Sequence, residues 1–216
     1  MDFEQARFNM IEQQIRPWDV LDQDVLDALR LVQRELFVAP AQQALAFADV
    51  ELPTACGQCL LPPKIEAKAL QALAVRPGDS ILEVGAGSGH MAALLAARGE
   101  WVRSIEIEPE LVNLAAGNLA RNGVDNVIVE EGDGLAGWPS GAPYDVIMLS
   151  GGVTEVPAVL IEQLKTGGRL FAFVGSAPLQ QGVLLHKQAD GSVMRRVVLE
   201  TLVTPLRNCA AQAFAF

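Results

Sequence analysis

Glu83-Val84-Gly85-Ala86-Gly87-Ser88-Gly89 is the segment that is most informative about the fold. It follows an apolar run, Ser80–Val84, and precedes a helix-like run, Met91–Arg98, so the pattern predicts a turn from a strand into a helix. Glycines in such a turn permit a tight bend and let the backbone come close to a ligand. The stretch therefore predicts a ligand site at the carboxyl end of a strand in an α/β sheet.

Strand-like and helix-like runs continue to alternate on both sides of this turn. The other expected strands are Trp101–Glu106, Val127–Glu130, Asp145–Leu149 and Arg169–Val174, and the other expected helices are 64–75, Glu110–Asn122 and Val156–Lys165. Such alternation predicts a parallel sheet that is covered on both faces. Two final runs, Val183–Lys187 and Arg195–Val203, flank Asp190-Gly191, which is a hairpin signal. We therefore expect an α/β fold, Rossmann-like, with a mostly parallel seven-stranded sheet and an antiparallel end.

The first part of the chain has a different, mostly helical pattern. Apolar residues recur at helical spacing in two sets, Met10, Ile11 and Ile15, then Val25, Leu26, Leu29, Val32 and Leu36. Pro17 and Pro40 are expected to end these helices. The segment Leu52–Pro63 reads as a loop. We therefore divide the chain into residues 1–62, a helical extension with a loop that contacts the substrate, and residues 63–216, the ligand-binding domain.

Composition excludes several classes of protein and partner. Of the 216 residues, 50% are hydrophobic and 19% charged, which excludes a disordered chain. Acidic residues outnumber basic ones by 26 to 16 without a basic cluster, so we expect no nucleic-acid partner. No apolar run approaches the roughly 20 residues that span a bilayer, so we expect no membrane partner. Three cysteines, and a start that does not resemble a secretory signal, predict a cytoplasmic protein.

Three positions indicate which ligand the turn binds. The chain has no Gly-Lys-Ser/Thr, and Gly85, Gly87 and Gly89 differ from the dinucleotide spacing. Glu106 ends the next strand about twenty residues on, where a carboxylate can accept both hydroxyls of a ribose. Asp133, between two glycines after the third strand, suits an adenine amino group.

These positions resemble the fold of S-adenosylmethionine (SAM) methyltransferases. Pro143–Ile147 and Leu164–Leu170 are similar to that fold's fourth strand and the turn into its fifth. The resemblance implies SAM as cofactor and no metal. It implies cofactor contacts from Glu83, Gly85, Ala86, Gly87, Ser88, Gly89, Glu106, Ile107, Asp133 and Gly134.

The whole chain further resembles the protein-L-isoaspartate O-methyltransferase family. The resemblance is carried by Arg34–Val38, Gly57-Gln58, Ala92–Ala96 and Thr204–Leu206. It implies repair of damaged protein or peptide by methylation of an isoaspartyl carboxylate. An ionised carboxylate is already a nucleophile, so the enzyme's main task is alignment.

The chain departs from this family in its acceptor loop, the segment that would face the methyl acceptor. The family typically reads Gly-Gln-Thr-Ile-Ser-Ala-Pro-His, where this chain reads Gly57–Lys64, with Cys59 for threonine, Leu61 for serine and Lys64 for histidine. A lysine can attract an anionic acceptor as a point charge. No catalytic residue is assigned, and the acceptor-loop candidates are Gln58, Cys59, Leu61 and Lys64.

Two alternatives stay open because of these replacements. The same scaffold could methylate a different acceptor, or the chain could bind SAM without catalysis. The small residues after the fourth strand, Ser150–Val153, form the other expected wall of the acceptor site. Cys56 and Cys59 have the spacing of a redox pair, but they fall in a loop, so we expect no functional dithiol. His90 is expected near the cofactor rather than as a base.

Overall fold

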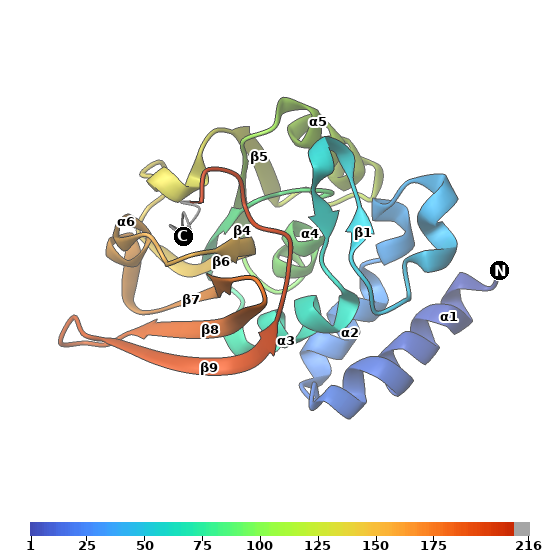
Figure 1. Cartoon of the computed structure of the whole chain (residues 1–216), viewed down its shortest axis with the longest axis horizontal. Coiled ribbons are helices and arrows are strands. Elements are labelled where there is room, and N and C mark those ends of the chain that lie inside the picture. Colours follow the sequence, from blue (N-terminus) through green and yellow to red (C-terminus); the bar gives the residue numbers. More distant parts are fainter. Residues whose placement is uncertain (210–216) are drawn as a thin grey trace, which may run out of the picture.

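A seven-stranded sheet forms the centre of the protein (Figure 1). The computed structural model describes residues 1–209. Along the sheet the strands run β5 (Val127–Glu131), β4 (Trp101–Glu106), β3 (Ser80–Val84), β6 (Tyr144–Val153), β7 (Leu164–Ser176), β8 (Leu179–Lys187) and β9 (Val193–Thr201). The first four pairings are parallel and the last two antiparallel. The expected mostly parallel sheet with an antiparallel end is confirmed.

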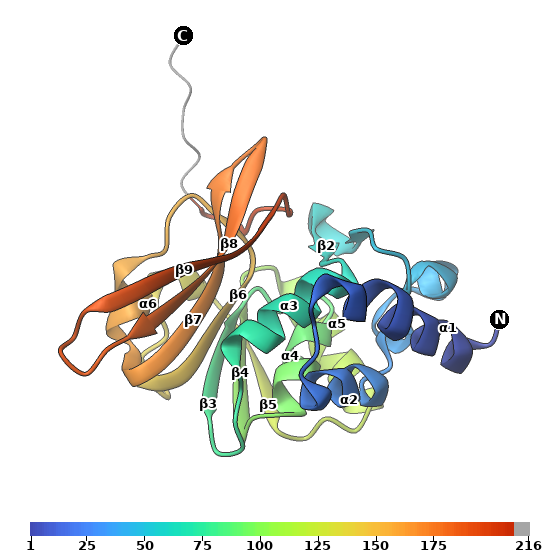
Figure 2. The ribbon, with the colours of Figure 1, turned by 90° about the horizontal axis from the view of Figure 1, so that it is seen from below.

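Both faces of the central strands are buried under other elements. In β6, Val146 and Met148 pack into one core cluster, while Ile147 and Leu149 pack into the other. A strand buried on both sides needs an unbroken apolar run, which is what the sequence has there. The helices α3 (Pro63–Leu73), α4 (His90–Ala96) and α5 (Pro109–Arg121) cover one face, and α6 (Ala158–Glu162) covers the other (Figure 2).

The N-terminal segment packs onto the same face as α3 and α4. It consists of α1 (Phe3–Met10), a π-helical turn (Ile11–Ile15), a 3-10 turn (Arg16–Trp18), α2 (Gln23–Leu31) and two more 3-10 turns (Arg34–Phe37 and Pro40–Leu45). Met10, Ile11 and Ile15 are buried, as their spacing predicts. Leu36 was expected on the buried stripe, but its side chain is 41% exposed. The α-helix ends at Leu31 and Val32 is extended, so the helical phase is lost before Leu36.

Several elements differ from their expected bounds. Strands β7 and β8 begin earlier than expected, at Leu164 and Leu179, and β9 spans Val193–Thr201 rather than Arg195–Val203. The helix expected over Val156–Lys165 spans only Ala158–Glu162, because Leu164 already pairs with Tyr144 as the start of β7. Strand β6 continues through Gly151 and Gly152 to Val153. The loop expected at 52–63 contains a short hairpin, β1 (Leu52–Pro53) and β2 (Cys59–Leu60), around a 3-10 turn.

The segment after β9 crosses back to the carboxyl end of the parallel strands, beside the β1–β2 hairpin (Figure 1). Gly152 N donates to Thr204 O at 3.0 Å, and Leu206 N donates to Gly152 O at 2.9 Å. The carboxylate of Glu51 accepts from Thr204 N and Oγ1, at 2.8 and 3.1 Å. These bonds fix residues 204–206 between the hairpin and β6.

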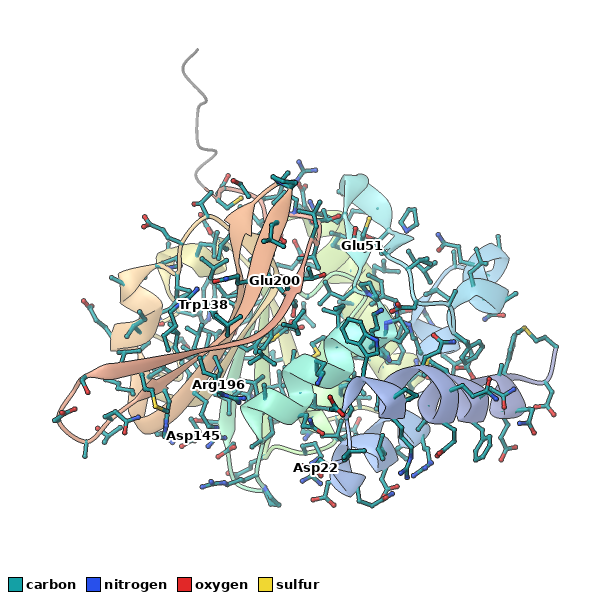
Figure 3. The ribbon with its side chains drawn as sticks, turned by 60° about the horizontal axis from the view of Figure 1, so that its bottom comes forward. Asp22, Glu51, Trp138, Asp145, Arg196 and Glu200 are labelled. Carbon is teal, nitrogen blue, oxygen red and sulfur yellow. The ribbon has the colours of Figure 1, made fainter. Side chains whose placement is uncertain are left out.

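The opposite end of the sheet is closed by polar contacts around Asp145. Its Oδ2 accepts from Ser80 N, Ser80 Oγ and Lys165 Nζ, at 2.7–2.9 Å. Figure 3 shows Asp145 at the end of the sheet opposite Glu51. Within residues 1–209, no helix combines the length and the apolar character needed to cross a membrane.

Candidate functional site

A cleft lies at the carboxyl ends of the parallel strands, where the sequence predicts the ligand site. It measures about 490 Å³ including its open mouth. It is lined by Gln58, Cys59, Val84, Gly85, Gly87, Ile105, Glu106, Ile107, Gly132, Asp133, Gly134, Leu135, Ser150, Leu206 and Arg207. The cleft therefore joins the Gly-rich turn, the hairpin and the segment after β9.

The three glycines of the turn are needed for different reasons. Gly85, Gly87 and Gly89 all have positive φ, at +93°, +53° and +86°. A Cβ on Gly87 would meet no atom of residues 1–209 within 4 Å, so its backbone faces space that a ligand can approach. A Cβ on Gly89 would lie 3.2 Å from Ala115 O, so this glycine allows α4 to pack against α5. Gly89 is outside the cleft.

Glu106 is held in one orientation by backbone donors. Its Oε2 accepts from Gly87 N at 2.9 Å, and its Oε1 accepts from Ile107 N at 2.9 Å and Glu108 N at 3.1 Å. A carboxylate has about four lone-pair sites, so three protein bonds leave one for a ligand hydroxyl. The carboxylate thus links the Gly-rich turn to the end of β4 and stays available to the cleft.

Asp133 lies at the far wall, between two glycines that admit no side chain. A Cβ on Gly132 would come within 2.6 Å of the Trp138 ring, and one on Gly134 within 2.8 Å of Val84 Cγ1. Asp133 Oδ1 accepts from Leu135 N at 3.0 Å, and Oδ2 accepts from Asn208 Nδ2 at 3.1 Å. Asp133 Oδ2 therefore already accepts one hydrogen bond, from the side-chain amide of Asn208.

A second, smaller pocket of about 260 Å³ lies beneath the turn. We call it the lower pocket; it is lined by Cys59, Leu60, Leu61, Glu66, Glu83, Gly85, Ala86, Gly87, Ser88, His90, Met91 and Ser150. The expected cofactor residues are thus divided, because Glu83, Ala86 and Ser88 line only this pocket. Ser88 Oγ is buried without a hydrogen-bond partner among residues 1–209.

Glu83 lies on β3, and its side chain is fully buried at the position where β3 pairs with β4 and β6. Its Oε2 accepts from Ser104 Oγ at 2.5 Å, and its Oε1 bonds Ser150 Oγ at 2.7 Å. Burial raises the pKa of Glu83 to about 8, although the two hydroxyls oppose this. The carboxyl group is therefore mostly protonated at neutral pH.

The structure brings two of the four acceptor-loop candidates into the cleft. Gln58 and Cys59 line it. The Leu61 side chain is 4% exposed and packs into the core, so it reaches only the lower pocket. Lys64 lies outside both pockets, because its ammonium pairs with Asp49 and sits 3.8 Å from the centre of the Trp18 ring.

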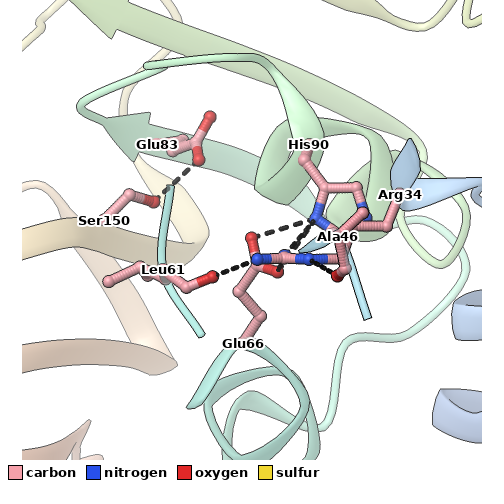
Figure 4. Close-up of polar contacts among 7 residues, drawn as sticks. All are labelled: Arg34, Ala46, Leu61, Glu66, Glu83, His90 and Ser150. Carbon is pink, nitrogen blue, oxygen red and sulfur yellow. Dashed lines mark hydrogen bonds and ion pairs between the residues drawn. The ribbon is translucent and has the colours of Figure 1, made fainter. Parts of the chain in front are cut away.

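A buried polar network that the sequence patterns did not predict anchors the acceptor loop (Figure 4). Arg34 pairs with Glu66, and it donates from Nε to Ala46 O at 2.8 Å and from Nη2 to Leu61 O at 2.5 Å. Glu66 Oε2 also lies 2.9 Å from His90 Nδ1. The sequence did carry a signal, because Glu66, Leu70 and Leu73 share one helical stripe, which places a charge among core positions.

Arg207 and Asn208 were also not predicted, because only long-range folding brings Arg207 to the cleft and Asn208 to Asp133. Arg207 Nε lies 3.2 Å from Glu108 Oε1, and its Nη2 donates to Cys56 O. The Cys56 thiol lies 3.6 Å from Glu110 Oε2, and its pKa is raised by desolvation and then by that carboxylate. A raised pKa lowers the reactivity of a thiol.

Comparison with known proteins agrees with this geometry. A model of the family described as protein-L-isoaspartate(D-aspartate) O-methyltransferase matches residues 5–210. A protein-L-isoaspartate O-methyltransferase of Aeropyrum pernix is 38% identical over 208 residues, covering 94% of this chain and 80% of the relative. One from Syntrophobacter fumaroxidans is 39% identical over 191 residues, covering 88% and 89%.

Two solved structures are similar over almost the whole chain. One, titled protein-L-isoaspartate O-methyltransferase, has a TM-score of 0.80 at 28% identity, covering 95% of this chain and 66% of its own. The other, from Plasmodium falciparum and solved with S-adenosyl-L-homocysteine, has a TM-score of 0.81 at 18% identity, covering 96% and 99%. At that identity the second likeness shows the fold alone.

Proposed function

Because this chain belongs to the protein-L-isoaspartate(D-aspartate) O-methyltransferase family, we propose that it methylates an isoaspartyl carboxylate of damaged protein or peptide, with SAM as donor. The observation that carries the proposal is the Glu106 carboxylate, fixed by three backbone N–H groups beside an open Gly87. A polar group held this way is ready for a ligand before the ligand arrives.

The residues of the cleft fit SAM. Glu106 would accept one ribose hydroxyl at its remaining lone-pair site, and Asp133 would accept the adenine amino group over the glycines that flank it. The amino-acid end would extend past Gly87 toward the lower pocket, where Ser88 Oγ lacks a partner among the described residues. The acidic lining also suits a ligand with a net positive charge.

The protein's part in methyl transfer is alignment and exclusion of water. When bound, SAM supplies an electrophilic methyl carbon, to which the acceptor oxygen bonds while the carbon–sulfur bond breaks and its electron pair returns to sulfur. The hairpin residues Gln58 and Cys59 and the crossing residues Leu206 and Arg207 bound the cleft from above. Good alignment of ionised nucleophile and methyl group supplies most of what such a reaction needs.

Two further proposals concern the roles of the two parts of the chain and the location of the protein. We propose that residues 1–62 serve the acceptor and residues 63–216 the cofactor, supported by the hairpin's place over the cleft. A cytoplasmic location is supported by the odd number of cysteines in the sequence.

The test is methyl transfer from labelled SAM to a peptide that contains isoaspartate, with the same peptide containing aspartate as the control. Binding of S-adenosyl-L-homocysteine (SAH) is measured by calorimetry on the same sample. We expect transfer to the isoaspartyl peptide alone. Binding without transfer would point to a different acceptor, and absence of both would point to a chain that does not use SAM.

A further inference from the structure

The acceptor loop offers the cleft no hydroxyl group. Its two side chains in the cleft are the amide of Gln58 and the thiol of Cys59. Leu61, where the family has serine, packs its side chain into the core, and its carbonyl oxygen accepts a hydrogen bond from Arg34. A hydroxyl group that could hold the acceptor carboxylate in this chain must therefore come from outside the loop.

Ser150 is placed to supply that group. Four residues line both the cleft and the lower pocket: Cys59, Gly85, Gly87 and Ser150. Two of these are glycines and a thiol is a weak donor, so the Ser150 hydroxyl is the one strong side-chain donor at the junction of the two pockets. It lies in the C-terminal half of β6, next to the Gly-rich turn, where a Cβ on Gly85 would lie 3.8 Å from Ser150 Cβ.

We infer that Ser150 donates the hydrogen bond that positions the acceptor carboxylate, with Glu83 behind it as its partner. This inference rests on the proposed function, and it names the residue that replaces the missing loop serine. Ser150 is half-buried and its Oγ lies 2.7 Å from Glu83 Oε1, so the hydroxyl is held in place while one side faces the pockets (Figure 4).

The protonation of Glu83 decides where the serine proton points. A protonated Glu83 can donate from Oε1 to Ser150 Oγ while Oε2 accepts from Ser104, which leaves the Ser150 proton free for an anionic acceptor. An ionised Glu83 only accepts, so it draws the Ser150 proton onto itself. It also adds a negative charge beside the acceptor carboxylate.

This arrangement makes acceptor binding depend on pH. The groups that face Glu83 are the Ser104 and Ser150 hydroxyls, the carboxylates of Glu66 and Glu106, and His90 of the same pocket. Burial is the largest cause of the raised Glu83 pKa of about 8. The KM for the peptide is therefore expected to rise as the pH passes 8, and this rise is expected to disappear in Glu83→Gln.

The experiment measures peptide KM at saturating SAM, together with the Kd of SAH, for the full chain and three variants. Ser150→Ala is expected to raise the peptide KM about tenfold or more, as for a lost hydrogen bond to a charged group, with little change in SAH Kd. Ser150→Thr keeps the hydroxyl and is expected to restore the KM. Ser104→Ala removes the other hydroxyl bonded to Glu83 but lines neither pocket, so it reports effects that pass through Glu83 alone.

Each outcome decides between explanations. An unchanged peptide KM in Ser150→Ala, or an equal loss of SAH affinity, would overturn the assignment of Ser150. An equal rise of KM in Ser104→Ala would show that both hydroxyls act only by placing Glu83, which also overturns it. If the unaltered chain binds SAH but transfers no methyl group to the peptide, the proposed function itself fails, and the Ser150 inference fails with it.

Discussion

Replacing Glu83 by glutamine should change how stability depends on pH. The carboxyl group is fully buried in the folded chain, and its pKa rises from 4.5 to about 8. The folded state therefore keeps a proton that the unfolded state releases above pH 4.5. This contribution to stability is complete below pH 4.5 and is lost as the pH rises through 8.

The size of the effect follows from that difference in pKa. Each pKa unit corresponds to about 1.4 kcal/mol, so the folded state should lose about 5 kcal/mol between pH 4.5 and 8 through this group. That is a large share of the roughly 5–15 kcal/mol that stabilises a typical domain. Glutamine cannot ionise, yet its Oε1 can still accept from a serine hydroxyl.

Urea unfolding at half-unit steps from pH 5 to 9 measures this directly. Relative to Glu83→Gln, the unaltered chain should lose about 1.4 kcal/mol per pH unit up to pH 8, and nothing further beyond it. Glu155→Gln removes an exposed carboxyl group and serves as the control for a change of net charge. If the free energy of unfolding depends on pH in the same way for the unaltered chain and for Glu83→Gln, Glu83 does not have the raised pKa on which this prediction rests.

Three further changes test other parts of the site. Glu106→Ala should weaken SAH binding roughly 10- to 100-fold, as for lost hydrogen bonds to a charged group, and calorimetry that finds unchanged affinity would remove Glu106 from the ribose site. Glu66→Gln breaks the buried pair with Arg34 and should cost about 3–5 kcal/mol in urea unfolding, because a charge stays buried without its partner; a loss below about 1 kcal/mol would contradict this. Lys64→Met should leave the peptide KM within about twofold in the transfer assay, since the ammonium is paired with Asp49 outside both pockets. A large rise in KM would return Lys64 to the acceptor site.

Local patterns were sufficient to predict the sheet and the strand ends that line one side of the cleft. The turn at Glu83–Gly89 and the acid at Glu106 each end a strand, and parallel strands bring their carboxyl ends to one edge. Where a helical sequence pattern and strand pairing favour different structures for the same residues, strand pairing determines the structure. Leu164 has a place in a helical pattern, but it pairs with Tyr144, so the helix ends at Glu162.

The acceptor side could not be predicted as well, because long-range contacts determine it. Arg207 reaches the cleft through a crossing segment held by Glu51, a residue over 150 positions earlier. Lys64 is the last residue of the acceptor loop, yet its ion pair with Asp49 holds its side chain away from the pockets. Neither of these two contacts can be predicted from the spacing of residues in the sequence.

Anchoring the acceptor loop through a backbone carbonyl has an evolutionary consequence. Arg34 binds the main chain of Leu61, and every amino acid offers the same carbonyl oxygen. The side chains that the loop presents to the cleft, Gln58 and Cys59, can therefore be exchanged while the loop keeps its path. The scaffold separates what holds the loop from what the loop presents, so acceptor preference can drift among relatives without rebuilding the fold.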